Sequence, residues 1–163
     1  MKLKIMKITR ILAVMALTGL MISCGGEAKE EKKEDLKIGT KKETKKNDSN
    51  AVNLALSGDD FMKFDKSELR AKAGQKVTLT LRHVGKVDIK IMGHNFVLLK
   101  QEVSIPSFSA KAAAAGQAKD WIPEDGAEVI AHTKMIGGGQ STTVTFTAPE
   151  KGTYDFICSF PGH

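Results

Sequence analysis

Short apolar segments separated by turn residues recur from residue 52 to the end of the chain. The separating stretches, such as Ser57–Asp60 and Ala148–Gly152, are rich in residue types that favour turns. Strands of this length at this spacing are typical of an antiparallel β-sandwich or barrel. The predicted strands are Val52–Leu56, Phe61–Phe64, Val77–Leu81, Val87–Met92, Phe96–Leu99, Val129–Ala131, Thr142–Thr147 and Tyr154–Cys158.

One segment, Phe108–Lys119, lacks the alternation of a strand and is rich in alanine. Because alanine has the highest intrinsic helix propensity, we predict a single helix inserted between strands. The fold class that follows is all-β with one helix. The three glycines at 137–139 predict a hairpin turn, since the Gly-Lys-Ser/Thr of a phosphate-binding loop does not follow them.

The first 23 residues have the composition of a secretory signal peptide. Residues 1–10 carry four basic side chains and no acidic one, and residues 11–22 form a twelve-residue apolar run. A transmembrane helix needs roughly 20 apolar residues, so this run has the proportions of a signal-peptide core instead. We predict that residues 1–23 are a lipoprotein signal peptide because of the cysteine that follows them.

Cys24 ends the sequence Met21-Ile22-Ser23-Cys24, which resembles a bacterial lipobox. In lipoproteins with this motif the cysteine thiol is lipidated and becomes the first residue of the mature protein. The alternative is an ordinary signal peptide followed by an incidental cysteine. We expect lipidation, because an exposed free thiol is otherwise unusual at this place.

Residues 24–50 follow as the lipidated cysteine and a charged tether. Fifteen of the 26 residues from 25 to 50 are charged, with lysine and glutamate interleaved. Such a segment buries too little apolar surface to offset the entropy of ordering it. We therefore expect a solvated, disordered tether, and place the folded domain at residues 51–163.

The net charge of +6 does not predict a nucleic-acid binder. Residues 51–163 hold 13 basic and 12 acidic side chains, so the excess lies mainly in the N-terminal segment. A folded domain that neutralises phosphates needs a clustered basic surface. Composition therefore argues against nucleic acid as a partner.

Two segments far apart in the sequence carry the side chains for metal chemistry. His94 lies between two predicted strands, Cys158 ends the last predicted strand, and His163 follows five positions later, after Phe-Pro-Gly. Cysteine and histidine at this spacing place a thiolate and an imidazole on one short turn. Two imidazoles and one thiolate in a trigonal arrangement form the ligand set of a blue-copper site.

Other readings of these residues remain open at this point. A structural zinc site normally needs four good ligands, and the predicted domain has one cysteine and no C-x2-C pair. A nucleophilic Cys–His pair needs a third orienting residue and surroundings that lower the thiol pKa. Because Cys158 ends a predicted strand, its context argues against a role as a catalytic nucleophile.

The domain resembles the azurin family of small bacterial blue copper proteins, from about Val52 to His163. The strongest stretches are residues 92–98 (MGHNFVL), 129–137 (VIAHTKMIG) and 156–163 (FICSFPGH). The resemblance implies a cupredoxin-like Greek-key β-sandwich or barrel with an inserted helix, and one type 1 copper ion as cofactor.

The resemblance also implies roles for particular residues. His94, Cys158 and His163 match the three equatorial copper ligands, and Gly93 matches the residue whose backbone carbonyl approaches the metal axially. Asn95 matches a side chain that ties the two ligand loops together. Met92 and Phe160 match apolar residues around the exposed imidazole, and His83 and His132 match histidines that are not ligands.

Two departures from the family pattern carry expectations. The family has a disulfide near the start of the domain, for which no cysteine is present here. The family also continues past the second ligand histidine to an axial methionine and a final strand. We therefore expect the encoded protein to continue past His163, with a methionine about four positions on. Without that strand, the sheet should have an unpaired edge.

The expected function is that of a copper-dependent one-electron carrier in the bacterial cell envelope. Its expected partners are redox proteins, namely cytochromes or copper- or haem-containing reductases, and the membrane through the lipid anchor. The anchor would face the periplasm, on the outer membrane if the cell is Gram-negative. The alternative function is a periplasmic copper-binding or copper-delivery module. We do not expect an enzyme, because a copper oxidase or nitrite reductase would need a second copper site.

Overall fold

The structure, a computed structural model, describes residues 1–6 and 50–163. The predicted lipobox with Cys24, the apolar run before it and nearly all of the predicted tether lie outside these residues. The domain boundaries drawn from the sequence therefore remain predictions.

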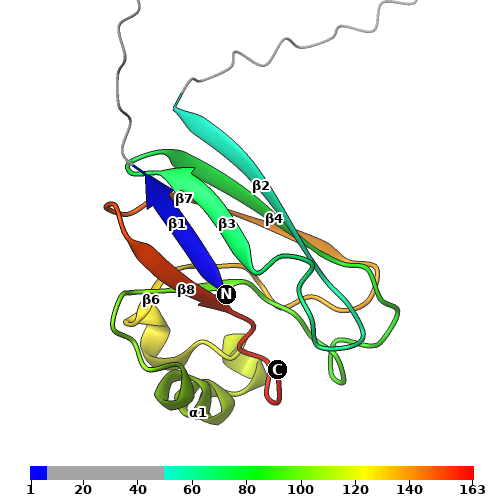
Figure 1. Cartoon of the computed structure of the whole chain (residues 1–163). Helices are drawn as coiled ribbons and strands as arrows, with labels where there is room; N and C mark the ends of the chain where they lie inside the picture. The colour runs from blue at the N-terminus through cyan, green and yellow to red at the C-terminus, as the bar shows by residue number, and fades with distance from the viewer. Residues whose placement is uncertain (7–49) are drawn as a thin grey trace, which may run out of the picture. The chain divides into compact units, whose positions relative to one another are not determined.

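Within the described residues the chain forms two β-sheets with a short helix beside them (Figure 1). One sheet has five strands in the order β3-β1-β8-β5-β6, and the other has three in the order β2-β4-β7. This arrangement confirms the predicted all-β class with one inserted helix. The strands are β1 (Lys2–Met6), β2 (Ala51–Gly58), β3 (Glu68–Lys72), β4 (Lys76–His83), β5 (Val97–Leu99), β6 (Val129–His132), β7 (Ser141–Thr147) and β8 (Thr153–Ile157).

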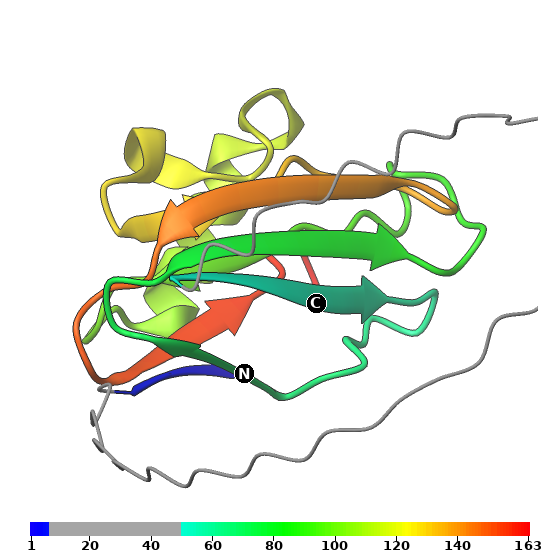
Figure 2. The ribbon, with the colours of Figure 1, turned by 90° about the horizontal axis from the view of Figure 1, so that it is seen from above.

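Alternating side chains explain why the two sheets pack face to face. In β4, Val77, Leu79 and Leu81 are fully buried, while every second residue between them points outward. Figure 2 shows β4 in the middle of the three-stranded sheet, between β2 and β7. Inward side chains of both sheets, including Phe156, form one hydrophobic core together with Phe96, the residue before β5. A period of two residues is what a strand with one buried face requires.

The helix α1 (Ile105–Ala115) packs on the other face of the five-stranded sheet. Leu98 of β5 belongs to the core between the sheets, whereas Val97 and Leu99 belong to a second cluster with Phe108 and Ala112 of α1. Helix α1 has a proline in its first turn and ends at Gly116, whose φ of 73° suits glycine. Two 3-10 turns follow, η1 (Gln117–Lys119) and η2 (Pro123–Gly126).

Two predicted strands are turns in the structure, which corrects the sequence prediction. In the segment Phe61–Phe64, the Asp59 carboxylate accepts hydrogen bonds from the backbone N–H groups of Phe61 and Lys63. In the segment Val87–Met92, the Asp88 carbonyl accepts from the N–H groups of Ile91 and Met92. Aspartate side chains and carbonyls therefore hold these apolar runs as turns. The other six predicted strands are present.

The sequence prediction missed two strands, β1 and β3. In β3 the inward residues are Leu69 and Ala71, a weak apolar signal between charged neighbours. Strand β1 comes from the basic segment that the sequence assigns to a signal peptide. It lies between β3 and β8, so the unpaired edge expected beside the last strand is filled in the structure. That expectation is wrong for this structure.

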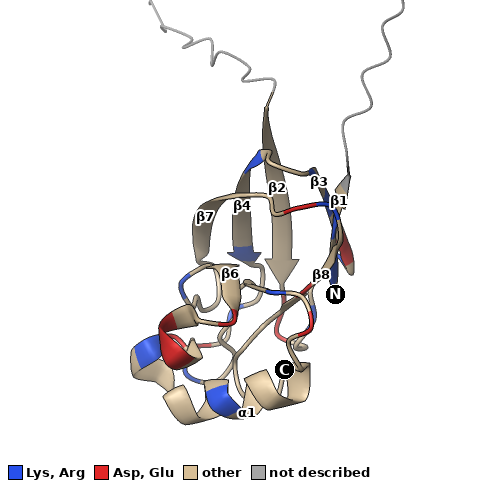
Figure 3. Cartoon of the chain, turned by 90° about the vertical axis from the view of Figure 1, so that its left-hand side faces the viewer, with Lys and Arg blue, Asp and Glu red and all other residues tan. Residues whose placement is uncertain are grey.

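Charged residues of both signs are interspersed over the described ribbon (Figure 3). No helix among the described residues is long and apolar enough to cross a membrane.

Candidate metal centre

His94 reaches the site from the segment just before β5. The backbone N–H groups and carbonyls of His94 and Ile136 pair across an isolated bridge, with both N–H···O distances at 2.9 Å. This bridge holds the segment in place where regular strand pairing has not yet begun. The imidazole is 1% exposed.

Cys158 and His163 reach the site from the short loop after β8. Strand β8 ends at Ile157, and the chain then turns, so that the His163 N–H donates to the Phe160 carbonyl at 3.2 Å. Strand pairing of Val97 with Ile157 fixes the start of this loop against β5. The sheet thereby brings residues 94 and 158 together from distant parts of the sequence.

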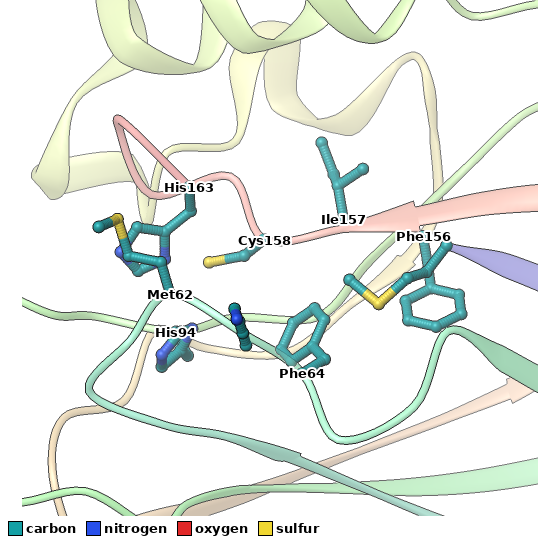
Figure 4. Close-up of a pocket in the computed structure, with 9 residues that line it drawn as sticks. Met62, Phe64, His94, Phe156, Ile157, Cys158 and His163 are labelled. Atoms are coloured by element: carbon teal, nitrogen blue, oxygen red, sulfur yellow. The ribbon is translucent and has the colours of Figure 1, made fainter.

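The three side chains converge on one point (Figure 4). One ligand atom from each of His94, Cys158 and His163 lies within 4.8 Å of the other two. The two imidazole rings have centroids 4.8 Å apart. The structure therefore brings together the three side chains that the sequence singled out.

A hydrogen bond sets the tautomer of His94. Its Nε2 donates to the Asp59 carbonyl at 2.7 Å, because a carbonyl oxygen can only accept. Nδ1 is then the basic nitrogen, and it is buried without a hydrogen-bond partner among the described residues. The Nδ1 of His163 is likewise buried and without a partner there. Buried polar atoms are normally paired, so an unpartnered nitrogen on each of two histidines that converge with one thiol indicates a place for a bound metal.

Burial keeps both imidazoles neutral. It is the largest cause lowering the pKa of His94, and it lowers the pKa of His163 to about 4, with further lowering from His94 and His83. Charging either ring would remove the lone pair that a metal needs. Both rings are therefore ready to act as ligands at neutral pH.

Burial also keeps the Cys158 thiol protonated in the metal-free chain. It raises the thiol pKa to about 11, while the backbone N–H groups of Asn95 and Phe160 act in the opposite direction. Such a thiol is a poor nucleophile, which argues against the Cys–His nucleophile considered above. A bound metal cation would deprotonate the sulfur. The two N–H groups would then stabilise the thiolate.

Gly93 lies directly against the sulfur. The Cys158 thiol donates to its carbonyl at 3.7 Å. A Cβ at this position would come within 2.8 Å of the Ile89 carbonyl oxygen and 2.9 Å of the Phe160 ring. Only glycine therefore lets this carbonyl approach the site.

Asn95 joins the segment of His94 to the loop of Cys158. Its Nδ2 donates to Ser159 Oγ at 2.8 Å, and its Oδ1 accepts from the Ser159 N–H at 2.9 Å. Nδ2 also donates to the Asp120 carbonyl at 3.1 Å. The side chain is fully buried, so each of these bonds is shielded from water.

The remaining histidines of the folded part lie outside the group of three. His83 is 1% exposed, and its Nε2 donates to the Met92 carbonyl at 2.8 Å. Its ring lies 4.8 Å from that of His94, centroid to centroid. His132 is on the surface. Neither belongs to the cluster of ligand atoms.

Sequence reasoning missed three contributors to the site. The Asp59 carbonyl orients His94, but a backbone acceptor leaves no trace in the sequence. Trp121 packs against Phe160 with ring centroids 5.0 Å apart, and Phe160 packs against His163 at 4.9 Å. Met1 lines a pocket of about 130 Å³ together with all three candidate ligands. Only the nonlocal contacts identify these residues.

The residues present fit a copper ion. Two neutral imidazole nitrogens and one thiol converge without hydrogen bonds to one another, and soft and borderline donors of this kind suit copper in a trigonal site. A structural zinc site would want a fourth strong ligand, and the described residues offer a group of three. A β-sandwich with such a site defines a small copper protein.

Comparison with known proteins agrees with this class. Residues 50–163 match the family described as copper binding proteins, plastocyanin/azurin family. The chain belongs to this family. It binds copper as a blue-copper, cupredoxin-like protein, and it is a copper-dependent one-electron carrier.

Individual relatives show how far the similarity extends. Azurin-1 of Alcaligenes xylosoxydans xylosoxydans is 41% identical over 112 residues, covering 66% of this chain and 86% of that protein. Outer membrane protein H.8 of Neisseria gonorrhoeae is 38% identical over 112 residues, covering 66% and 60% respectively. The solved structure of auracyanin A from Chloroflexus aurantiacus superposes with a TM-score of 0.63 at 34% identity, covering 69% of this chain and 90% of that one.

Proposed function

We propose that His94, Cys158 and His163 would hold the copper ion, with the Gly93 carbonyl as a weak further contact. Two observations carry this assignment: one ligand atom from each of the three residues lies within 4.8 Å of the other two, and both histidines have a buried Nδ1 without a partner among the described residues. When bound, copper supplies a one-electron couple between Cu(I) and Cu(II). The chain supplies a cage that changes little between the two states.

Several contacts make this cage rigid. The Asp59 carbonyl holds the His94 ring, and Asn95 ties the segment of His94 to the loop of Cys158. The N–H groups of Asn95 and Phe160 point to the sulfur and set how strongly the thiolate donates to the metal. Rigid ligands favour electron transfer, because neither oxidation state then requires the protein to rearrange.

We propose that electrons pass through the His163 ring. Pro161 and Gly162 in its loop are exposed, and His163 itself is partly exposed, whereas His94 is buried. Met62, which is 53% exposed, lines the same pocket. An apolar surface of this kind suits small, transient encounters with redox proteins such as cytochromes or copper- or haem-containing reductases.

We propose an electron carrier rather than an enzyme. A copper enzyme of this type would need a second copper site, and the sequence has four histidines. Two of them form the candidate centre, His83 is bound to a backbone carbonyl, and His132 is on the surface. The burial of His94 also disfavours a copper-delivery module, which needs an open and exchangeable site.

We further propose that the chain works in the bacterial cell envelope, anchored by lipid on Cys24 and facing the periplasm. The lipobox-like sequence and the charged segment after it support this proposal. The relative named outer membrane protein H.8 is consistent with an envelope location and, in a Gram-negative cell, with the outer membrane.

Copper-loaded Cys158→Ser tests the assignment of the ligands. The parent protein should show an intense visible charge-transfer band, and the variant should lose that band even where it retains some copper, because the band needs a thiolate bound to Cu(II). His132→Ala and His83→Ala are the matched controls and should keep the band. Loss of the band in either control would mean that the wrong imidazoles have been assigned.

A further inference from the structure

The turn after β2 supports His94 through its backbone. The Asp59 carbonyl accepts the hydrogen bond from His94 Nε2 at 2.7 Å. This carbonyl belongs to the peptide unit between Asp59 and Asp60. Because a peptide unit is planar, the position of Asp60 determines the direction in which the carbonyl points. Contacts that hold Asp60 in place therefore also affect the imidazole of His94.

The Asp60 carboxylate ties this turn to the loop after β4. Its Oδ2 accepts from the Lys86 N–H at 2.9 Å, and its Oδ1 accepts from the Val87 N–H at 3.2 Å. The Lys86 N–H is the largest cause lowering the pKa of Asp60, so the side chain is charged at neutral pH and can accept both bonds. One carboxylate thus joins two segments that are 26 and 27 positions apart.

The glycine at position 85 leaves room for this contact. A Cβ on Gly85 would collide with the Asp60 carboxylate, although Gly85 is not among the glycines with a positive φ. Close packing, rather than backbone conformation, therefore requires glycine here. The Gly85 N–H donates to His83 Nδ1 at 3.1 Å, and Asp60 Oδ1 lies 3.8 Å from His83 Nε2.

The same network reaches the segment that carries His94. The Nε2 of His83 donates to the Met92 carbonyl at 2.8 Å, and the ring centroids of His83 and His94 are 4.8 Å apart. His83 is 1% exposed, so its ring is confined between these neighbours. Asp60 therefore lies beside both supports of His94, the Asp59 carbonyl and the backbone around Met92.

We propose that Asp60 is a positioning residue for the candidate metal centre. It holds the Asp59 carbonyl in place, and that carbonyl sets the tautomer and the orientation of His94. The effect on copper rests on the proposed function, whereas the effect on the tautomer does not involve the metal. Loss of the group that orients a ligating histidine typically lowers metal affinity about 10- to 100-fold. Asp60 acts through one further residue, so we expect the lower end of this range.

The test measures the imidazole nitrogens of His94 by ¹⁵N NMR in the copper-free full chain. The parent should hold the proton on Nε2 alone. In Asp60→Ala the Asp59 carbonyl loses its support, so His94 should show both neutral tautomers, and the Lys86 and Val87 amides should exchange faster. Copper affinity, measured by competition with a chelator, should fall about tenfold. A pure Nε2–H tautomer in this variant would overturn the proposal. Parental copper affinity despite mixed tautomers would overturn the part that concerns the metal.

Asp65→Ala is the matched control. The Asp65 carboxylate accepts from the Ser57 N–H at 2.8 Å and from Lys66 Nζ at 2.8 Å. The substitution removes a carboxylate and a backbone hydrogen bond, as Asp60→Ala does, but the contacts of Asp65 do not reach the loop after β4. His94 should therefore keep the parental tautomer and copper affinity. Equal mixing of tautomers in Asp65→Ala and Asp60→Ala would indicate general loosening and overturn a specific role of Asp60.

Two more variants keep the test decisive. Asp60→Asn retains one acceptor oxygen and should mix the His94 tautomers less than Asp60→Ala. Gly85→Ala reaches the same carboxylate from the opposite side, because the added methyl group must displace it. If Asp60→Ala does not fold, Gly85→Ala decides, and a pure Nε2–H tautomer there would overturn the proposal. A failure of the proposed copper ligands would show separately, as a missing visible band in the copper-loaded parent.

Discussion

Burial, more than any neighbouring charge, sets the protonation of the three candidate ligands. It lowers the pKa values of His94 and His163 and raises that of Cys158, so each group is neutral in the metal-free chain. The lowered histidine pKa values and the raised cysteine pKa have one cause, because burial disfavours the charged form of each group. The three side chains therefore carry no charge until a cation binds to them.

The stability of the copper-free chain should therefore depend on pH in two windows. The folded pKa of His163 is about 4 against the usual 6.5, so between these values the unfolded chain binds more protons and stability rises with pH. The folded pKa of Cys158 is about 11 against the usual 9.0, so stability falls as pH rises between these values. Urea unfolding from about pH 5 to about pH 10 measures both windows.

One variant tests the assignment of the alkaline window to Cys158, and a second serves as its control. Cys158→Ala should weaken the alkaline fall and leave the acid window in place. His132→Gln, at an exposed site, should leave both windows unchanged. An alkaline fall of equal size in the parent and Cys158→Ala would contradict the assignment to the thiol.

At the scale of elements, the site depends on how three segments brace one another. The segment before β5 carries His94, the loop after β8 carries Cys158 and His163, and the turn after η1 carries the carbonyl of Asp120. Asn95 bonds to both of the other segments. Trp121 next to Asp120 belongs to the cluster that includes Phe108 of α1 and is packed by Phe160, so the inserted helix supports the ligand loop through the core.

Asn95→Leu should weaken this bracing. The substitution leaves the Ser159 N–H and the Asp120 carbonyl without their partner, which should cost about 1–3 kcal/mol of unfolding free energy per unsatisfied group. Loss of copper to a chelator should also become faster, because the two ligand segments are no longer tied. Denaturant unfolding and chelator kinetics measure the two effects.

Asn53→Leu is the control for this substitution, since Asn53 is exposed on β2. It should change unfolding free energy by about 0.5 kcal/mol or less and leave copper loss unchanged. Copper loss at the parental rate in Asn95→Leu would show that the tie does not hold the site.

At the scale of the whole molecule, the two cysteines should divide two functions. Cys24 is the predicted site of lipidation, and Cys158 is the proposed copper ligand. Cys24→Ser should move the protein from the membrane fraction to the soluble fraction while keeping the visible copper band. Cys158→Ser should stay in the membrane fraction and lose the visible copper band. Fractionation, mass spectrometry of the N-terminus and absorption spectra test the pair, and a membrane-bound Cys24→Ser variant would contradict the anchor.

Much of the fold was predictable because strands and turns have local causes. Alternating apolar residues in β4 and β7, and the alanine-rich run of α1, are signals that neighbouring residues carry by themselves. The failures at Phe61–Phe64 and Val87–Met92 have a local cause too. Asp59 and Asp88 hold these runs as turns, and an apolar run alone does not distinguish a turn from a strand.

The candidate site was predictable in its residue types and only partly in its geometry. Cys158 and His163 share one loop, so their proximity follows from five positions of sequence. The meeting of His94 with Cys158 depends on pairing between β5 and β8, whose residues are about sixty positions apart. The resemblance to azurins predicted that His94 lies close to Cys158, whereas their spacing in the sequence did not.

By itself, the sequence determined six of the eight strands, the presence of one helix within a few residues of its observed bounds and the side chains that carry metal chemistry, because these depend on the residues and their near neighbours. Tertiary structure alone decided the tautomer of His94, the neutrality of the thiol and the place of Lys2–Met6 between β3 and β8. The reason is that a backbone acceptor, a buried environment and an open sheet edge are all made by residues distant in sequence. The segment KLKIM has the composition of a signal peptide and the alternation of a strand, and in the structure it pairs with β3 and β8.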